Sequence, residues 1–254
     1  MTLLLGLHGI SKSFGGLHVN RDVSFDLRSG DRVALIGPNG GGKTTLVNVI
    51  SGDLAPTGGR ITLDGEDVTD LSIAERVRRG LGRTFQIARL FSTLTATENV
   101  ALAVMQRKGM TRRLLSVAGN SSDVRHECQE LLQTLGINHL AEFPVSKLAY
   151  GQQRLLEMAI GLALRPKVLL LDEPAAGVPH DETPKILGAI ERLPSDIAVL
   201  MIEHDMDLVF RFAERVLVLA NGQLIFEGTP AAVTADEEVR RAYLGSYADA
   251  RRSA

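Results

Sequence analysis

Short runs of consecutive apolar residues recur along this chain of 254 residues, separated by polar and glycine-rich stretches. The runs at 33–36, 168–171 and 197–202 are typical of parallel strands that are buried on both faces. The segment 19–27 instead alternates apolar and polar side chains, which predicts a half-buried antiparallel strand. The pattern therefore favours an α/β fold that combines a buried parallel core with an antiparallel part.

The other segments add short strands, hairpins and helices to this core. Further strands are expected at 3–10 and 81–85, and hairpins at 60–68, around Asp64-Gly65, and at 216–227, around Asn221-Gly222. Helices are expected at 45–51, 71–79, 95–107, 122–135 and 148–164. Because helices dominate from residue 86 to 165, we expect an inserted helical subdomain there, with 108–121 as a mobile surface loop.

A glycine-rich stretch lies between the first buried run and the first predicted helix. Residues 37–44 fit the pattern G-x-x-x-x-G-K-[ST]. Glycines permit positive φ, so backbone N–H groups can surround phosphate oxygens, and the helix that follows directs its N-terminal amides at the same anion. Lys43 is expected to reach the β- and γ-phosphates and Thr44 to bind Mg²⁺. The order of strand, loop and helix favours this nucleotide site over a glycine-rich turn that binds nothing.

Polar side chains follow two of the buried runs, and an aromatic residue stands upstream of the glycine-rich stretch. Because α/β sheets bind ligands at the carboxyl ends of their strands, Asp172 suits Mg²⁺, and Glu173 is placed to orient and deprotonate an attacking water. His204 is a candidate contact to the γ-phosphate, although a lone histidine after a strand is usually structural. Phe14 is either a ring that stacks on adenine or a core residue at a strand end.

Composition and charge narrow the function further. The net charge is -2 and the isoelectric point is about 6.3, so the chain lacks the excess of positive charge that non-specific binding of nucleic acid requires. No nucleic-acid partner is expected. The basic cluster of Arg76, Arg78, Arg79 and Arg83 is interpreted as a solvated helix face rather than a phosphate track. Cys128 is the only cysteine, and the apolar face of its helix indicates a core thiol. No apolar stretch approaches the ~20 residues that cross a bilayer, so a soluble, cytoplasmic protein is expected.

These motifs resemble, in order and along nearly the whole chain, those of the ATP-binding-cassette (ABC) ATPase subunits. The resemblance implies a P-loop NTPase (RecA-like) core with an antiparallel β subdomain and an inserted α-helical subdomain. It places the ABC ATPase domain at 1–245 and a C-terminal helical tail at 229–254. Within that domain it implies a core at 1–85 and 166–228 and a helical subdomain at 86–165.

The resemblance also implies roles, position by position. Phe14 matches the adenine-stacking loop, His204 the switch histidine, and Gln86 the glutamine that links magnesium and the γ-phosphate to the helical subdomain. The Walker A match comprises Gly37, Pro38, Asn39, Gly40, Gly41, Gly42, Lys43, Thr44 and Thr45. Leu148–Gln152 matches the LSGGQ signature, of which Tyr150, Gly151 and Gln152 are expected at the ATP. The implied catalytic residues are Glu173, His204, Gln86 and Lys43, and the implied magnesium ligands are Thr44, Gln86 and Asp172.

The implied activity is ATP hydrolysis at a head-to-tail interface between two ATPase subunits, identical or paralogous. ATP binding and hydrolysis would close and open this interface. Transmembrane permease subunits would receive that movement and hold the chain at the inner face of the membrane. A finer resemblance, to the importer ATPases for branched-chain amino acids, rests on 83–86, 89–91, 148–152, 173–177, 202–206 and 241–245. Urea or amide importers and lipopolysaccharide exporters are similar. A soluble non-transport ABC ATPase and a P-loop GTPase are further alternatives, the latter without its Asn-Lys-x-Asp motif.

Two positions depart from the pattern of the family. Ala149 replaces the serine of the signature, which removes a hydroxyl that the family directs at the partner's γ-phosphate. Pro179 stands where the D-loop normally ends in Asp or Asn, and proline offers neither a polar side chain nor an N–H donor. Both departures concern the contact between the two expected ATPase subunits.

Overall fold

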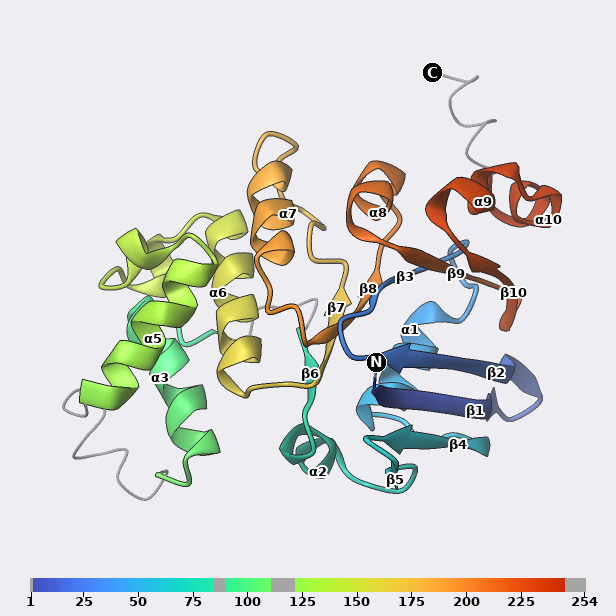
Figure 1. Ribbon diagram of the computed structural model, residues 1–254, viewed down its shortest axis with the longest axis horizontal. Helices are drawn as coiled ribbons and strands as arrows, with labels where there is room; N and C mark the ends of the chain where they lie inside the picture. The colour runs from blue at the N-terminus through green and yellow to red at the C-terminus, as the bar shows by residue number, and fades with distance from the viewer. Residues whose placement is uncertain (1, 85–89, 111–121, 245–254) are drawn as a thin grey trace.

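The computed structural model describes residues 2–84, 90–110 and 122–244, and the described residues form two sheets with helices around them (Figure 1). The larger sheet has the strand order β10-β9-β3-β8-β7-β6. Its strands are β3 (Arg32–Ile36), β6 (Leu81–Arg83), β7 (Val168–Asp172), β8 (Ala198–Ile202), β9 (Arg215–Ala220) and β10 (Gln223–Gly228). The smaller sheet, β2-β1-β4-β5, comprises β1 (Leu3–Phe14), β2 (Leu17–Arg28), β4 (Gly58–Leu63) and β5 (Glu66–Asp67).

The larger sheet is parallel except at one edge. Strands β6, β7, β8, β3 and β9 pair parallel, whereas β10 returns antiparallel to β9. The carboxyl ends of the five parallel strands therefore meet at one edge of this sheet. That edge is the place where ligands bind in α/β folds.

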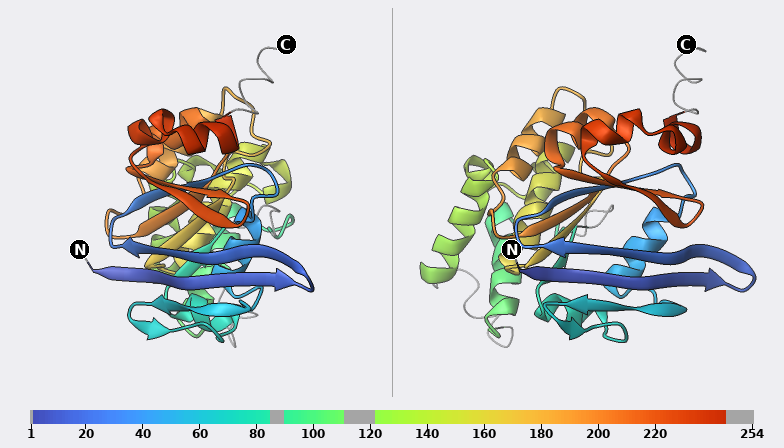
Figure 2. Two further views of the ribbon diagram at one scale, coloured as in Figure 1. Left: turned by 90° about the vertical axis from the view of Figure 1, so that its right-hand side faces the viewer. Right: turned by 45° about the vertical axis from the view of Figure 1, so that its right-hand side comes forward.

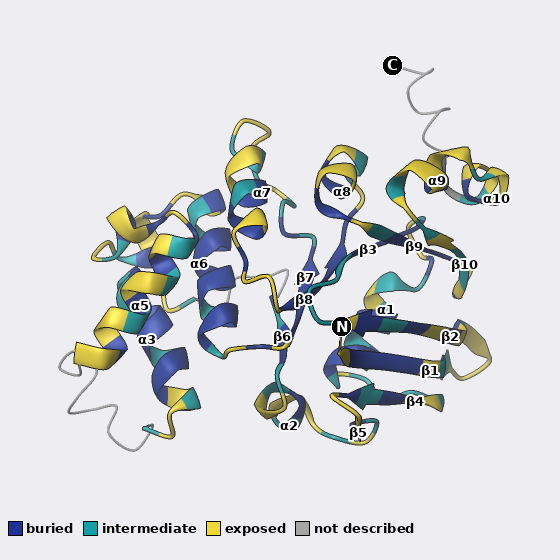
Figure 3. Ribbon diagram, viewed as in Figure 1, coloured by how far each residue is buried: buried dark blue, intermediate teal, exposed yellow. Residues whose placement is uncertain are grey.

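Two separate cores cover the two faces of the larger sheet, as the alternation along β3 shows. Val33 and Leu35 belong to one core, together with β1, β2, β4 and helix α1 (Lys43–Ser51). Ala34 and Ile36 belong to the other core. That second core contains α3 (Ala96–Arg107), α5 (Ser122–Thr134), α6 (Tyr150–Ala163), α7 (Thr183–Glu191) and α8 (Met206–Phe212). Strands β3, β7, β8 and β9 between them are almost fully buried, whereas exposed residues lie on the outer faces of the helices, on β10 and along the four-stranded sheet (Figure 3).

Short elements complete the described chain. They are α2 (Ile73–Arg78), η2 (Asn138–Leu140), η3 (Val145–Lys147), α9 (Pro230–Ala235), α10 (Glu237–Val239) and η4 (Arg240–Leu244). Figure 2 shows α9 and α10 on the side of the molecule opposite the four-stranded sheet. Among the described residues, no helix is long and apolar enough to cross a membrane.

Most predicted elements are confirmed, with several shifts in extent. The strand predicted at 3–10 continues to Phe14 because it pairs with β2 along its length, and the helix predicted from residue 45 begins at Lys43. The described part of the strand predicted at 81–85 is β6, which ends at Arg83. Helices α7 and α8 were not predicted, and residues 85–89 and most of the predicted loop 108–121 lie outside the described residues.

The interpretation of the basic cluster as a solvated helix face is wrong for two of its four members. Arg78 and Arg79 are exposed, but Arg76 is 1% exposed and the side chain of Arg83 is 12% exposed. Arg76 donates hydrogen bonds to the carbonyl oxygens of Val49 and Ile50, both at 2.7 Å, and so satisfies the last turn of α1. Burial lowers the pKa of Arg76, and the nearby charges of Asp70 and Asp53 oppose that shift.

Candidate functional site

The glycine loop (residues 37–44) joins the carboxyl end of β3 to the start of α1. Gly37 has φ of 152°, and a Cβ atom there would lie 1.9 Å from the carbonyl oxygen of Leu219 in β9. Gly42 has φ of 99° and caps α1, and a Cβ atom there would lie 2.6 Å from Nδ2 of Asn20. Glycine is therefore required at both ends of the loop, where the backbone packs closely against β9 and β2.

Neighbouring strands also hold the glycine loop by its backbone. The N–H of Gly222, in the turn between β9 and β10, donates a hydrogen bond to the carbonyl oxygen of Gly41 at 3.1 Å. The N–H of Arg21 in β2 donates in turn to the carbonyl oxygen of Gly222 at 2.8 Å. The loop is thus fixed against both sheets, which preorganises its shape.

Lys43 folds back over the glycine loop. Its Nζ atom donates to the carbonyl oxygens of Gly37 at 2.7 Å and Pro38 at 3.0 Å. Burial lowers the pKa of Lys43, and the nearby charge of Glu173 opposes that shift. An ammonium group that has lost part of its hydration gains more from a phosphate oxygen than a solvated one does.

The carboxyl ends of β7 and β8 bring the three predicted polar residues together. Asp172 is 2% exposed, whereas Glu173 is partly exposed and holds φ of 48°, a region rare for residues other than glycine. The N–H of Glu173 donates to the carbonyl oxygen of Ile202 at 2.9 Å. Nδ1 of His204 then lies 4.0 Å from Oε1 of Glu173. The strained turn therefore aims Glu173 toward the histidine of the neighbouring strand.

A further carboxyl group, Glu203, was not predicted to belong to the site. It is 2% exposed and accepts hydrogen bonds from the N–H of Ala175 at 3.3 Å and from the N–H of His204 at 3.1 Å. Burial raises the pKa of Glu203, and those two backbone hydrogen bonds oppose the shift. Glu203 connects the segment after Glu173 to His204, and its place between a buried run and His204 is the only sequence signal for it.

The chemistry of the donors fits magnesium. The Thr44 hydroxyl lies in the first turn of α1, at the carboxyl end of β3, and the Asp172 carboxylate lies at the carboxyl end of β7, two strands away in the same sheet. Oxygen donors of this kind are what Mg²⁺ prefers. Gln86, the third expected ligand and a predicted catalytic residue, lies outside the described residues.

The predicted signature lies at the start of α6, away from the glycine loop. Tyr150 and Gly151 begin the helix, and Oε1 of Gln152 accepts a hydrogen bond from the N–H of Ala149 at 2.9 Å. Helix α6 belongs to one core and α1 to the other, so the two lie on opposite faces of the larger sheet (Figure 1). The structure therefore does not bring the signature to the glycine loop of the same chain.

Phe14 ends β1 at the tip of the β1–β2 hairpin. It is 48% exposed, and Nζ of Lys12 lies 5.0 Å from the centre of its ring. The alternative of a core residue at a strand end is therefore wrong. An exposed ring on this hairpin remains available to a planar ligand.

Fold and site together define a P-loop nucleotide-hydrolysing enzyme, and comparison with known proteins gives its family. Residues 20–176 match the ABC transporter family, and residues 223–249 match a family described as "Branched-chain amino acid ATP-binding cassette transporter". The chain therefore belongs to the ABC transporter family, as an ATP-hydrolysing subunit.

Individual relatives cover almost the whole chain. The high-affinity branched-chain amino acid transport ATP-binding protein BraF of Pseudomonas aeruginosa is 38% identical over 251 residues, which cover 95% of this chain and 98% of BraF. LivG of Escherichia coli, whose name describes the same kind of protein, is 38% identical over 249 residues, with the same coverage.

Solved structures of ABC cassettes share the fold. The ADP conformation of MJ1267, an ATP-binding cassette of an ABC transporter, superimposes with a TM-score of 0.84 at 30% identity, and covers 96% of this chain and 100% of that one. The dimeric structure of MJ0796, a bacterial ABC transporter cassette, gives a TM-score of 0.75 at 26% identity, over 89% of this chain and 99% of that one.

Proposed function

We propose that this chain uses ATP hydrolysis to drive the import of branched-chain amino acids through a membrane transporter. One observation carries the chemical part: the glycine loop, the Asp172–Glu173 pair and His204 all lie at the carboxyl edge of one sheet. The transported substrate rests on the C-terminal match at residues 223–249 and on the names of BraF and LivG.

ATP would bind along the glycine loop with its phosphates on the loop amides and on the N-terminus of α1. Lys43 would exchange its two carbonyl acceptors for oxygens of the β- and γ-phosphates, since a charged acceptor binds an ammonium more strongly than a carbonyl does. The exposed ring of Phe14 would stack on the adenine. The proposed nucleotide contacts are therefore Phe14, residues 37–45 and, from a second subunit, residues 150–152.

Magnesium, when bound, would neutralise charge on the β- and γ-phosphate oxygens. Thr44 and Asp172 would hold it, and Gln86 is proposed as a further ligand. Holding a divalent cation requires that the Asp172 carboxylate remain ionised and oriented.

Glu173 would act as the general base. As the water attacks the γ-phosphorus, its proton passes to a carboxylate oxygen of Glu173, and the bond between the γ-phosphorus and the bridging oxygen breaks to leave ADP. His204, 4.0 Å from Glu173, would orient the transferring phosphoryl group. Glu203 keeps the His204 backbone in place through its hydrogen bond at 3.1 Å.

The opposite placement of α1 and α6 supports a site that is completed by a second ATPase subunit. Residues 150–152 of one subunit would cap the ATP bound to the glycine loop of the other, because neither chain can bring both elements to one nucleotide. The solved structure of the MJ0796 cassette, which has a similar fold, is dimeric. A dimer of Glu173→Gln in Mg-ATP would identify the second subunit as a copy of this chain, and a monomer would favour a paralogue.

Transmembrane permease subunits are the proposed recipients of the motion, and they would hold this chain peripherally on the cytoplasmic face of the membrane. A cavity of about 590 Å³ lies where α2 and β6 of the core meet the end of α3, and Ile73, Val77 and Leu81 contribute to its lining. A permease segment docked there would contact both the core and the helical subdomain. Arg83 also lines this cavity and donates a hydrogen bond to Asp172, so such a segment would act near the proposed magnesium site.

Coexpression with the permease subunits, followed by transport assays in proteoliposomes, tests this proposal. We expect uptake of labelled leucine, isoleucine or valine that requires ATP and an intact Glu173. The chain is also 34% identical over 247 residues to the lipopolysaccharide export ATP-binding protein LptB of Haemophilus influenzae, which makes an exporter ATPase the second candidate. Uptake of urea instead, or copurification with a lipopolysaccharide exporter, would overturn the proposed substrate. Copurification with soluble partners alone would overturn the transport function.

A further inference from the structure

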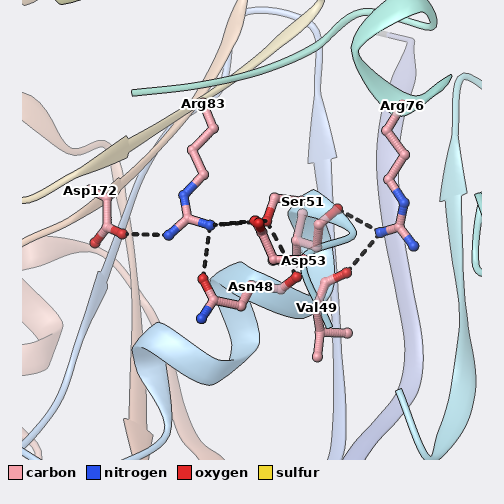
Figure 4. Close-up of polar contacts among 8 residues, drawn as sticks. Asn48, Val49, Ser51, Asp53, Arg76, Arg83 and Asp172 are labelled. Atoms are coloured by element: carbon pink, nitrogen blue, oxygen red, sulfur yellow. Dashed lines mark hydrogen bonds and ion pairs between the residues drawn. The ribbon is translucent and has the colours of Figure 1, made fainter. Parts of the chain in front are cut away.

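Arg83 joins the carboxylate of Asp172 to the last turn of α1. Its Nη2 atom donates to Oδ2 of Asp172 at 2.9 Å, and its Nη1 atom donates to Oδ1 of Asn48 at 2.8 Å (Figure 4). Nη1 also lies 3.0 Å from Oγ of Ser51 and 3.0 Å from Oδ2 of Asp53. The guanidinium group therefore occupies the space between β7 and α1 and contacts both.

These contacts connect three elements that meet at the proposed nucleotide site. Helix α1 begins at the glycine loop and carries Asn48 and Ser51 at its other end. Strand β7 ends at Asp172, and β6, which carries Arg83, leads toward Gln86. One side chain thus spans the helix that follows the glycine loop, the strand of the metal carboxylate and the strand that precedes a predicted magnesium ligand.

We propose that Arg83 is a positioning residue for magnesium, because it holds the Asp172 carboxylate at a fixed distance from α1. The inference rests on the proposed role of Asp172. Asp172 is 2% exposed, so an unpaired carboxylate there would be poorly solvated and free to rotate. One oxygen, Oδ2, accepts from Arg83, and no side chain among the described residues donates a hydrogen bond to the other, which we propose to face the metal or a water bound to it.

The planar fork of arginine suits this position better than a single charge would. Nη2 serves Asp172 while Nη1 serves the acceptors of α1, and the two nitrogens are held at a fixed separation. Lysine would keep the charge but has one nitrogen for both sets of acceptors. A lysine variant therefore separates positioning from charge neutralisation.

Arg76 provides a matched control within the same cluster. It is more deeply buried than Arg83 and binds the same end of α1, through the carbonyl oxygens of Val49 and Ile50 (Figure 4). Its other hydrogen bonds within the described chain also go to backbone carbonyl oxygens, and none goes to Asp172. A change at Arg76 therefore loosens the end of α1 without removing a partner of Asp172.

The experiment measures ATP binding to the full chain, first in EDTA and then during a magnesium titration, for wild type, Arg83→Gln, Arg83→Lys, Arg76→Lys and Asp172→Asn. For Arg83→Gln we expect ATP affinity in EDTA within about twofold of wild type. The magnesium concentration that gives half of the maximal effect on ATP binding should rise by about tenfold, the usual effect of losing a hydrogen bond between charged groups. For Arg83→Lys, this magnesium concentration should lie between those of wild type and Arg83→Gln. Arg76→Lys should lower the melting temperature without changing the magnesium dependence.

Other outcomes overturn the proposal. An unchanged magnesium requirement in Arg83→Gln removes the positioning role, and a lower requirement shows that Arg83 only competes with the metal. A rise of equal size in Arg76→Lys means that both arginines act through the folding of α1. If Arg83→Gln does not fold, Arg83→Lys alone tests the positioning role. The proposal is then overturned if the magnesium dependence of Arg83→Lys equals that of wild type. Wild-type magnesium dependence in Asp172→Asn would instead overturn the proposed role of Asp172, and the inference with it.

Discussion

The two faces of the larger sheet carry different kinds of structure. On the face of α1, charged side chains bridge separate elements: Arg76 and Arg83 fasten the end of the helix to backbone and side-chain groups from elsewhere in the core. On the other face, α3, α5 and α6 pack mainly on one another around an apolar core that includes Cys128, although the ion pair of Arg107 with Glu127 also joins α3 to α5.

We infer from this difference that the α1 face binds the nucleotide and that the helical face completes the nucleotide site of another subunit. The α1 face is braced so that the glycine loop, Lys43 and Asp172 keep a fixed geometry within one chain. The helical face carries residues 150–152, which the structure does not bring to the glycine loop of their own chain and which we propose to serve a second subunit. If the proposed signature residues and the glycine loop serve one nucleotide, their separation within a chain requires head-to-tail pairing of two subunits.

The largest effect is expected for Glu173→Gln. Glutamine keeps the shape of glutamate but does not accept a proton at neutral pH, so hydrolysis should fall by about 10²–10⁴-fold. ATP binding should survive because Lys43 and Asp172 are unchanged, and size exclusion in Mg-ATP should show a dimer. Steady-state ATPase assays and nucleotide titration check this, and turnover near that of wild type would remove Glu173 from the role of base. A monomer with slow turnover would contradict only the self-dimerisation.

The comparison of the two faces is tested by mixing two inactive variants. Lys43→Ala should weaken ATP binding by about tenfold or more, since a hydrogen bond between charged groups is lost, without lowering the melting temperature. Gly151→Ala should leave that binding intact and impair hydrolysis, because it adds a methyl group at a residue proposed to cap the nucleotide of the other subunit. Mixed subunits contain one site in which both residues are native, so part of the ATPase activity should return. Activity that does not return although the two variants form a mixed dimer would indicate that both residues serve the same chain's nucleotide.

The buried Glu203 should give a smaller effect, which depends on pH. Because burial raises its pKa, the folded state holds the proton more tightly than the unfolded state, and ionisation of Glu203 destabilises the fold. Its contribution to stability is present at acidic pH and is lost as pH rises from the ordinary range for glutamate to the raised value. Relative to wild type, Glu203→Gln should therefore gain unfolding free energy as pH rises through that window, about 1.4 kcal/mol for each unit of pKa difference. Urea unfolding of both proteins at several pH values measures this difference. A difference that does not vary with pH would contradict it.

The smallest effect concerns Cys128 on the helical face. Burial raises the pKa of its thiol to about 11, and the side chain is 0% exposed. A disulfide reagent at pH 8 should therefore leave the native protein unmodified and titrate one thiol after unfolding. Rapid reaction of the native protein would show that the helical core opens readily.

The sequence was most informative where function depends on the backbone. The glycine loop and the Asn221-Gly222 turn were predictable because their conformations require particular residues: φ is 50° at Asn221 and 77° at Gly222. The carboxylates at the end of β7 were predictable for a similar reason, since a buried run defines the strand and hence its end. Their nucleotide contacts remain predictions.

The buried arginines were not predictable from local pattern. Arg76 finds its acceptors at Val49 and Ile50, and Arg83 finds one at Asp172, far away in the sequence. A basic residue in a short amphipathic helix is usually solvated, and only tertiary packing reverses that expectation. Glu203 was missed because its hydrogen-bond donors are backbone N–H groups, which leave no mark on the sequence.

The contact between Gly222 and Gly41 has a consequence for protein engineering. The turn between β9 and β10 is a short hairpin tip of the kind that usually accepts an inserted tag or reporter domain. Here its N–H holds the glycine loop, its carbonyl oxygen binds Arg21, and a Cβ atom at Gly222 would lie 2.2 Å from the carbonyl oxygen of Val19. A fusion at this tip would therefore disturb nucleotide affinity, and permissive sites for labelling this protein have to be sought elsewhere, such as the turn at Gly65 between β4 and β5, where an added Cβ atom would meet nothing within 4 Å.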